Sequence, residues 1–172
     1  MRYLLIVLLI VFVGYSCNFM GKKNDKKIDS YYTRIAGWDY QRMPLIKPFE
    51  LTKLKGFDTW SINTSELPQM PDDLSPIDSI FCVQSFIFGH KQFYQNPEWE
   101  EFITPEMWFV IDVKSQKLIT YDRQDLFLEK NAMFFNNRNG LMPCDFYFDM
   151  FMESGTLPWF EDSIIIQIKT QY

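Results

Sequence analysis

Two stretches in the middle of the chain alternate apolar and polar residues with the period of two that is typical of β-strands. Residues 57–63 place Trp60 and Ile62 on the same side, so they predict a short strand whose two large side chains face the core. Residues 77–90 are more apolar, and the pair Gln84–Ser85 interrupts them. We therefore expect two strands there, joined by a kink or turn at that pair.

A β-hairpin follows. Met107–Val113 has the composition of a strand, the polar residues 114–117 predict a turn, and residues 118–121 predict the returning strand. On the N-terminal side of this hairpin, the proline-rich residues 66–76 and the polar, aromatic residues 91–105 predict loops.

The segment Gly37–Phe49 precedes these strands and shows no helical stripe. It contains Pro44 and Pro48, and each proline favours extended backbone in the residue before it. We expect an extended segment that crosses the surface of the domain, either as an edge strand or as a strap that faces a ligand.

The C-terminal third predicts helices. Asp122 fits a helix N-cap with Asp125 three residues later, which predicts a helix over Arg123–Phe134 that ends in the polar residues before Gly140. The apolar spacing over Cys144–Ser154 predicts a second helix, with Gly155 as its C-cap.

The last apolar stretch is read differently. Residues 163–169 contain the triplet Ile164-Ile165-Ile166, which favours a late strand buried on both faces or an extended tail. Strands come first and helices later, without regular alternation, so the predicted class is α+β. We expect one domain over residues 31–172, with an antiparallel sheet of about 4–6 strands packed against two helices near the C-terminus.

The N-terminus has the plan of a secretory signal peptide: Arg2, an apolar run over Tyr3–Val13, and small residues before a cysteine. The apolar run is too short to span a bilayer comfortably, because about 20 apolar residues are needed. We expect residues 1–16 to be removed. An ordinary secreted protein and a retained helix remain alternatives.

The residues Gly14-Tyr15-Ser16-Cys17 resemble the lipobox of bacterial lipoproteins. This resemblance implies that Cys17 is acylated and becomes the first residue of the mature chain, anchored in the membrane by its lipid. The polar residues 17–30 would form a flexible tether. Because Asn18 is not an aspartate, the resemblance favours the outer membrane, on its periplasmic side.

The other two cysteines, Cys82 and Cys144, form an even pair that an oxidising compartment could join in a disulfide. Cys82 lies in an apolar run, and buried free cysteine is also common. Both states therefore remain open.

Composition narrows the range of functions that the chain could have. The chain carries 17 Lys and Arg against 22 Asp and Glu, and a net charge of −5 disfavours nucleic-acid binding, which requires a basic face. Aromatic residues make up 18% of the chain, which fits either a packed core or a recognition surface. There is no zinc-ligand, calcium-loop or phosphate-loop pattern, and the lone His90 is expected at the surface. We expect no enzyme, no metal and no cofactor.

Two groups of residues are candidates for binding a partner protein: Trp38, Tyr40 and Arg42 on the extended segment, and Trp99, Glu100 and Glu101 in the acidic loop. For each of them, a place in the core or on a solvated surface is the alternative. Glu98, Glu100 and Glu101 beside Trp99 could also form a sugar site with paired carboxylates.

Residues 38–48 and 108–130 resemble stretches of small bacterial lipoproteins that carry one compact domain. Some proteins of that group are immunity proteins that neutralise delivered toxins. The resemblance implies a non-enzymatic, protein-binding envelope protein, and an immunity or inhibitor protein is its specific form. An accessory structural lipoprotein of an envelope assembly is the alternative, and a glycan-active enzyme is the third.

Overall fold

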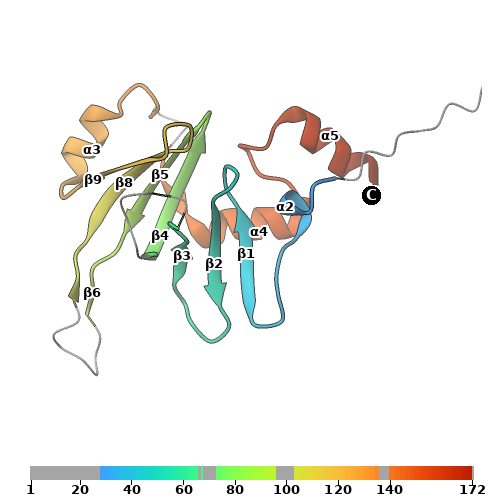
Figure 1. Cartoon of the computed structure of the whole chain (residues 1–172), viewed down its shortest axis with the longest axis horizontal. Helices are drawn as coiled ribbons and strands as arrows, with labels where there is room; N and C mark the ends of the chain where they lie inside the picture. The colour runs from blue at the N-terminus through green and yellow to red at the C-terminus, as the bar shows by residue number, and fades with distance from the viewer. Residues whose placement is uncertain (1–27, 66, 68–72, 96–102, 136–139, 172) are drawn as a thin grey trace, which may run out of the picture.

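The structure is a computed structural model, which describes residues 28–65, 67, 73–95, 103–135 and 140–171 (Figure 1). Its centre is an antiparallel sheet, and the α+β class is confirmed. Within these residues the sheet has eight strands, more than the 4–6 expected. Seven of them follow one another in the sheet as β1 Tyr40–Pro44, β2 Glu50–Leu54, β3 Trp60–Ile62, β4 Leu74–Val83, β5 Phe86–Lys91, β8 Met107–Asp112 and β9 Lys117–Tyr121.

The remaining elements are attached to this sheet. The short β10 (Met142–Pro143) pairs with β4, and β6 (Tyr94–Gln95) pairs with β7 (Ile103–Thr104) in a separate two-stranded sheet. The helices in the described part of the chain are α2 (Ser30–Thr33), α3 (Gln124–Lys130), α4 (Cys144–Ser154) and α5 (Asp162–Gln171).

Alternation along β4 divides the core between the two faces of the sheet. Ile80 and Cys82 belong to the larger cluster, which α4 and α5 complete, whereas Phe81 belongs to a smaller cluster with Phe127 of α3. The smaller cluster is dominated by phenylalanine rings in mutual contact. Helices therefore pack on both faces of the sheet.

The alternating pattern predicted several elements correctly. Trp60 and Ile62 are buried in β3, and the hairpin of β8 and β9 is present. A turn separates β4 from β5 at the predicted position, where Gln84 has a φ of 56°. The segment that contains β1 supplies an edge strand of the sheet, which was one of the two alternatives predicted for it.

Both predicted loops contain strand residues. β4 already begins at Leu74, which lies opposite Ile62 of β3, and the two-residue strands β6 and β7 pair across the second loop. The strand β2 was not predicted at all, because the polar residues Thr52 and Lys53 separate its only apolar residues, Leu51 and Leu54. Pairing with neighbours on both sides makes this stretch a strand.

The first predicted helix is shorter than expected. Arg123, rather than Asp122, is the N-cap of α3. The guanidinium of Arg123 pairs with the Asp125 carboxylate, so Asp125 does not form the expected capping box. The chain leaves the helix after Lys130 and turns back over the sheet, where Phe134 contacts rings of β5.

The prediction of a late strand was wrong, since residues 162–171 form helix α5. Ile164, Ile165 and Ile168 pack on the larger cluster, and their spacing of one and four residues matches a helical face. Ile166 is exposed. The isoleucine triplet thus has one buried side rather than the two of a central strand. The second helix and its C-cap are confirmed, because Gly155 is left-handed at a φ of 67°.

The folded part also begins earlier than expected. Ile28 is buried in the larger cluster, and the Asp29 side chain accepts a hydrogen bond from the Tyr31 backbone N–H at 2.9 Å. These residues were expected to lie in the tether.

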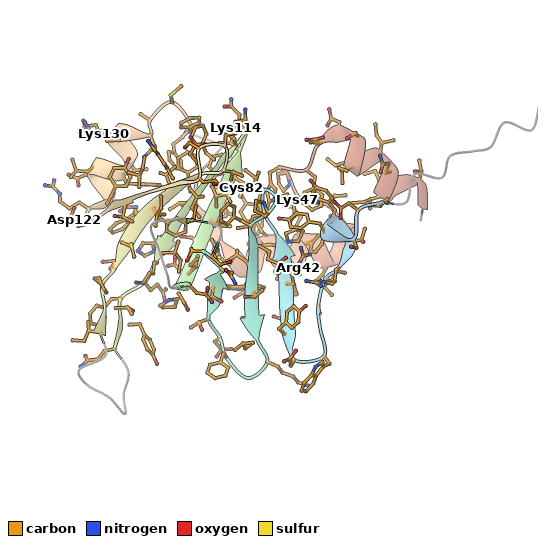
Figure 2. All side chains as sticks on the ribbon, in the orientation of Figure 1. Arg42, Lys47, Cys82, Lys114, Asp122 and Lys130 are labelled. Carbon is orange, nitrogen blue, oxygen red and sulfur yellow. The ribbon has the colours of Figure 1, made fainter. Side chains whose placement is uncertain are left out.

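Arg42 holds this N-terminal segment against β1 (Figure 2). Its side chain is only 1% exposed. Its Nη1 donates to the carbonyl oxygens of Tyr31 at 2.8 Å and Arg34 at 2.7 Å, and its Nε donates to the carboxylate of Glu50. The guanidinium also lies over the ring of Tyr31. Arg42 was a candidate for partner binding, and its burial overturns that role.

We predict that Arg42→Met destabilises the domain by about 3–5 kcal/mol, because it leaves a partly buried carboxylate and two carbonyl oxygens without their donor. Urea unfolding measures the effect. The matched control is Arg34→Gln, which removes an exposed ion pair to the same Glu50 and should cost less than about 1 kcal/mol. Equal losses for the two variants would contradict the assigned role of Arg42.

Candidate protein-binding site

Four apolar side chains gather where β1 begins and β2 ends. Tyr40 and Leu54 face each other across the two strands, and the loops beyond them carry Trp38 and Phe57. We call these four residues the aromatic tip. A backbone hydrogen bond of 2.8 Å from Lys55 N–H to the Asp39 carbonyl oxygen holds the two loops together.

Glycines make this arrangement possible. A Cβ at Gly37 would lie 2.2 Å from the Tyr40 ring, so only glycine lets that ring pack across the loop. The Gly37 N–H donates to the Tyr40 carbonyl oxygen at 3.0 Å, which closes the loop that presents Trp38. On the other side, Gly56 turns the chain with a φ of 90°.

The tip is unusually exposed for its composition. Trp38 is 90% and Phe57 63% exposed, and Leu54 is exposed beside them. The four residues border a hollow of about 410 Å³ whose rim carries Lys55 and Asp58. Side chains of this kind on two hydrogen-bonded loops form an exposed apolar surface with charges of both signs at its edge, which is suited to docking.

The structure thus brings together two of the residues predicted for binding, Trp38 and Tyr40, and removes Arg42 from the group. Sequence reasoning missed Leu54 and Phe57. The sequence did contain a signal for Phe57. In the alternating pattern that leads into β3, Phe57 falls on the side opposite to Trp60, and that side faces solvent. Trp99, Glu100 and Glu101, together with Glu98, lie outside the described residues.

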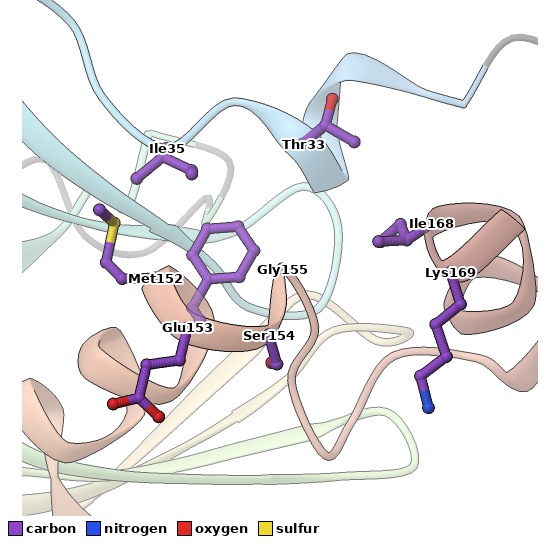
Figure 3. Close-up of a pocket in the computed structure, with 9 residues that line it drawn as sticks. Thr33, Ile35, Met152, Glu153, Ser154, Gly155, Ile168 and Lys169 are labelled. Carbon is purple, nitrogen blue, oxygen red and sulfur yellow. The ribbon is translucent and has the colours of Figure 1, made fainter. Parts of the chain in front are cut away.

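A second hollow, of about 540 Å³, lies between the end of α2 with the residues that follow it, the end of α4, and α5 (Figure 3). Its apolar lining includes the core residues Phe151 and Ile168. Glu153 and Lys169 contribute one charge of each sign. This lining therefore favours neither an anionic nor a cationic ligand.

His90 is less exposed than expected. Its ring stacks on Trp108, its Nδ1 lies 2.8 Å from an Asp78 carboxylate oxygen, and its Nε2 lies 3.1 Å from that of Glu106. Both ring nitrogens thus face carboxylates. The hydroxyl of Ser79 donates to Asp78 rather than to the histidine. This arrangement ties β4, β5 and the start of β8 together, and it leaves neither nitrogen directed at a serine or cysteine nucleophile.

Cys82 of β4 and Cys144 of α4 are both buried free thiols. The structure therefore differs from the disulfide interpretation. β10 places the start of α4 beside β4 through the pairing of Pro143 with Ser79, and this packing buries both sulfur atoms without joining them. Burial raises the pKa of each thiol.

Within the described residues, no His, Cys, Asp and Glu side chains form a group of three or more that could hold a metal ion. No helix in that part of the chain is both long and apolar enough to cross a membrane. Comparison with protein-family models, curated proteins and solved structures finds no match.

The buried thiols predict a loss of stability at alkaline pH. In the unfolded chain they ionise near their ordinary pKa of about 9, whereas the folded domain keeps them neutral. The unfolded state therefore loses protons first as the pH rises. The free energy of unfolding should fall above about pH 9, by up to about 1.4 kcal/mol per pH unit for each thiol.

Urea unfolding between about pH 7 and pH 11 measures this slope. Cys144→Ala should make the slope shallower by the contribution of one thiol, which is up to about 1.4 kcal/mol per pH unit. Burial also raises the pKa of Tyr31, which adds to the slope above about pH 10 in both proteins. An unchanged slope in Cys144→Ala would contradict the prediction.

Proposed function

We propose that this chain is a lipid-anchored protein of the cell envelope whose domain binds another protein through the aromatic tip. The observation that carries the binding role is the exposure of Trp38, at 90%, and of Phe57, which lines the same hollow. Exposing such side chains to water is unfavourable, and a clustered apolar patch is typical of an interaction surface. The sequence Gly14–Cys17 supports the lipid anchor.

The chemistry of the tip favours a protein partner. Tryptophan and tyrosine are enriched among the residues that contribute most to protein–protein binding, because they bury a large area at a small cost in side-chain entropy. Trp38 and Tyr40 stand on a loop that is hydrogen-bonded to itself and to the neighbouring loop. Little ordering is therefore needed on binding, which favours affinity.

An immunity or inhibitor protein is the specific form of this proposal. Such a protein has to fill or cover a site on a delivered toxin, and a projecting aromatic tip has a suitable shape. The net charge of −5 would steer the chain toward a basic partner, since opposite charges accelerate encounter. The anchor would hold the protein at the membrane where the toxin arrives.

The binding role is tested with a lipid-free chain that starts at Asn18 and so keeps the buried Ile28. The immobilised chain is used to capture its partner from an envelope and secreted-protein extract, and mass spectrometry identifies the partner. Trp38→Ala and Phe57→Ala should each weaken binding at least about tenfold, or about 1.4 kcal/mol. Both variants should unfold within about 0.5 kcal/mol of the wild type, because both side chains are exposed.

Met133→Ala is the matched control, since Met133 is 85% exposed and lies outside the tip. It should bind like the wild type. A partner that all three variants retain equally would place the binding surface elsewhere and refute the role of the tip.

The anchor is tested by metabolic labelling with a clickable fatty acid. The wild-type chain and Cys82→Ala should both carry the label, whereas Cys17→Ala should carry none, because its residue 17 has no sulfur to acylate. In-gel fluorescence measures the label. Label that persists on Cys17→Ala would rule out this lipidation site.

A further inference from the structure

The two edges of the large sheet are built differently. Along β1, the Arg42 N–H donates to the Ile35 carbonyl oxygen at 2.7 Å, and Ala36 forms an isolated bridge with Gln41. The chain before β1 therefore covers that edge. At the other end of the sheet, β9 pairs with β8 alone among the described residues.

Within the described residues, the β9 edge carries little of the usual protection against strand addition. Proteins protect edge strands with prolines, bulges, charged side chains such as lysine, or a covering segment. β9 has the sequence Lys117-Leu118-Ile119-Thr120-Tyr121, with no proline and one charge, at its end. Its register with β8 runs over five residue pairs without a shift. Ile119, at the centre of the strand, is 48% exposed. A straight, apolar edge of this kind is a template for another strand.

We propose that β9 pairs antiparallel with β9 of a second copy of this chain, about a twofold axis at Ile119, to join the two sheets into one. A twofold interface requires a surface that is complementary to itself. In this register Ile119 meets its own counterpart, Leu118 lies opposite Thr120 of the partner subunit, and Lys117 lies opposite Tyr121 of the partner subunit.

This register is favourable for each pair. Directly opposite residues interact most strongly across strands, and like charges in that position are destabilising. The only charged residue of β9, Lys117, lies opposite Tyr121 of the partner subunit, so the β9 pairing sets no two lysines opposite each other. The centre is an isoleucine pair, whose burial is favourable. A shift of one residue in either strand would destroy this match, because it moves side chains to the other face.

This dimer is independent of the proposed function. The aromatic tip is formed by β1 and β2, at the end of the strand order opposite to β9 (Figure 1). Pairing through β9 would leave both tips free, so one dimer would present two binding surfaces. If the tip variants did not affect partner binding, the β9 proposal would still stand. If the β9 variants did not affect dimer formation, the proposed role of the tip would still stand.

Site-specific cross-linking of the purified full chain tests the register. Under mild oxidation Ile119→Cys should form a disulfide-linked dimer, because its counterpart lies directly opposite. Lys117→Cys alone and Tyr121→Cys alone should not, because each residue lies four positions, or roughly 13 Å, from its own counterpart. A mixture of the latter two variants should cross-link. The wild-type chain controls for Cys17, Cys82 and Cys144.

Sedimentation of the same full chain gives a second readout. Ile119→Lys should raise the dimer dissociation constant at least about tenfold, because it opposes two lysines. An equimolar mixture with Ile119→Glu should restore dimers. Met133→Lys adds the same charge at an exposed position outside β9 and should dimerise normally.

Three results would overturn the proposal. The first is a wild-type chain that stays monomeric up to about 1 mM. The second is equal cross-linking of all three single cysteine variants, which would indicate random collision. The third is a dimer that Ile119→Lys leaves intact, which would place the dimer interface elsewhere.

Discussion

The buried guanidinium of Arg42 is the constraint on which the N-terminal half of the fold depends. A buried charge is tolerated only when it is paired and hydrogen-bonded, and Arg42 satisfies this requirement with Glu50 and the carbonyl oxygens of Tyr31 and Arg34. These contacts hold the entering chain against β1. The same segment then covers the β1 edge through Ile35, and it continues into the loop that presents Trp38. A structural charge thus positions the candidate binding surface.

A second polar link joins the sheet to its main helix. Asp145, in the first turn of α4, accepts hydrogen bonds from Lys53 at 2.7 Å and from the Trp60 indole N–H at 2.8 Å. Partial burial raises the pKa of this carboxyl. The two hydrogen bonds together lower the pKa by more than burial raises it, so the pKa lies below its ordinary value. Lys53 directly precedes Leu54 of the tip. The tip therefore stands on strands that are fixed from both faces, by Arg42 on one and by α4 on the other.

Much of the candidate site could not be found from the sequence alone. Trp38 and Tyr40 were predicted, but nothing in the local pattern distinguishes them from Arg42, which follows Tyr40 by two residues in β1. The difference arises because α2 and the following Arg34 accept hydrogen bonds from Arg42, whereas Trp38 stays exposed. Leu54 joins the site only through its register with Tyr40. Such pairings connect residues that are distant in the chain, and local periodicity carries no information about them.

The sequence by itself determined the elements whose pattern has one physical explanation. Alternation placed Trp60 and Ile62 in the core and predicted the hairpin of β8 and β9, while helical spacing and Gly155 defined α4. Tertiary structure decided the rest. As a short apolar run, the isoleucines of residues 162–171 fit a strand or a helix equally well, and only their packing on the larger cluster selects the helix. Which edge of the sheet is covered was likewise decided by long-range packing, because edge hydrogen bonds depend on where the rest of the chain passes.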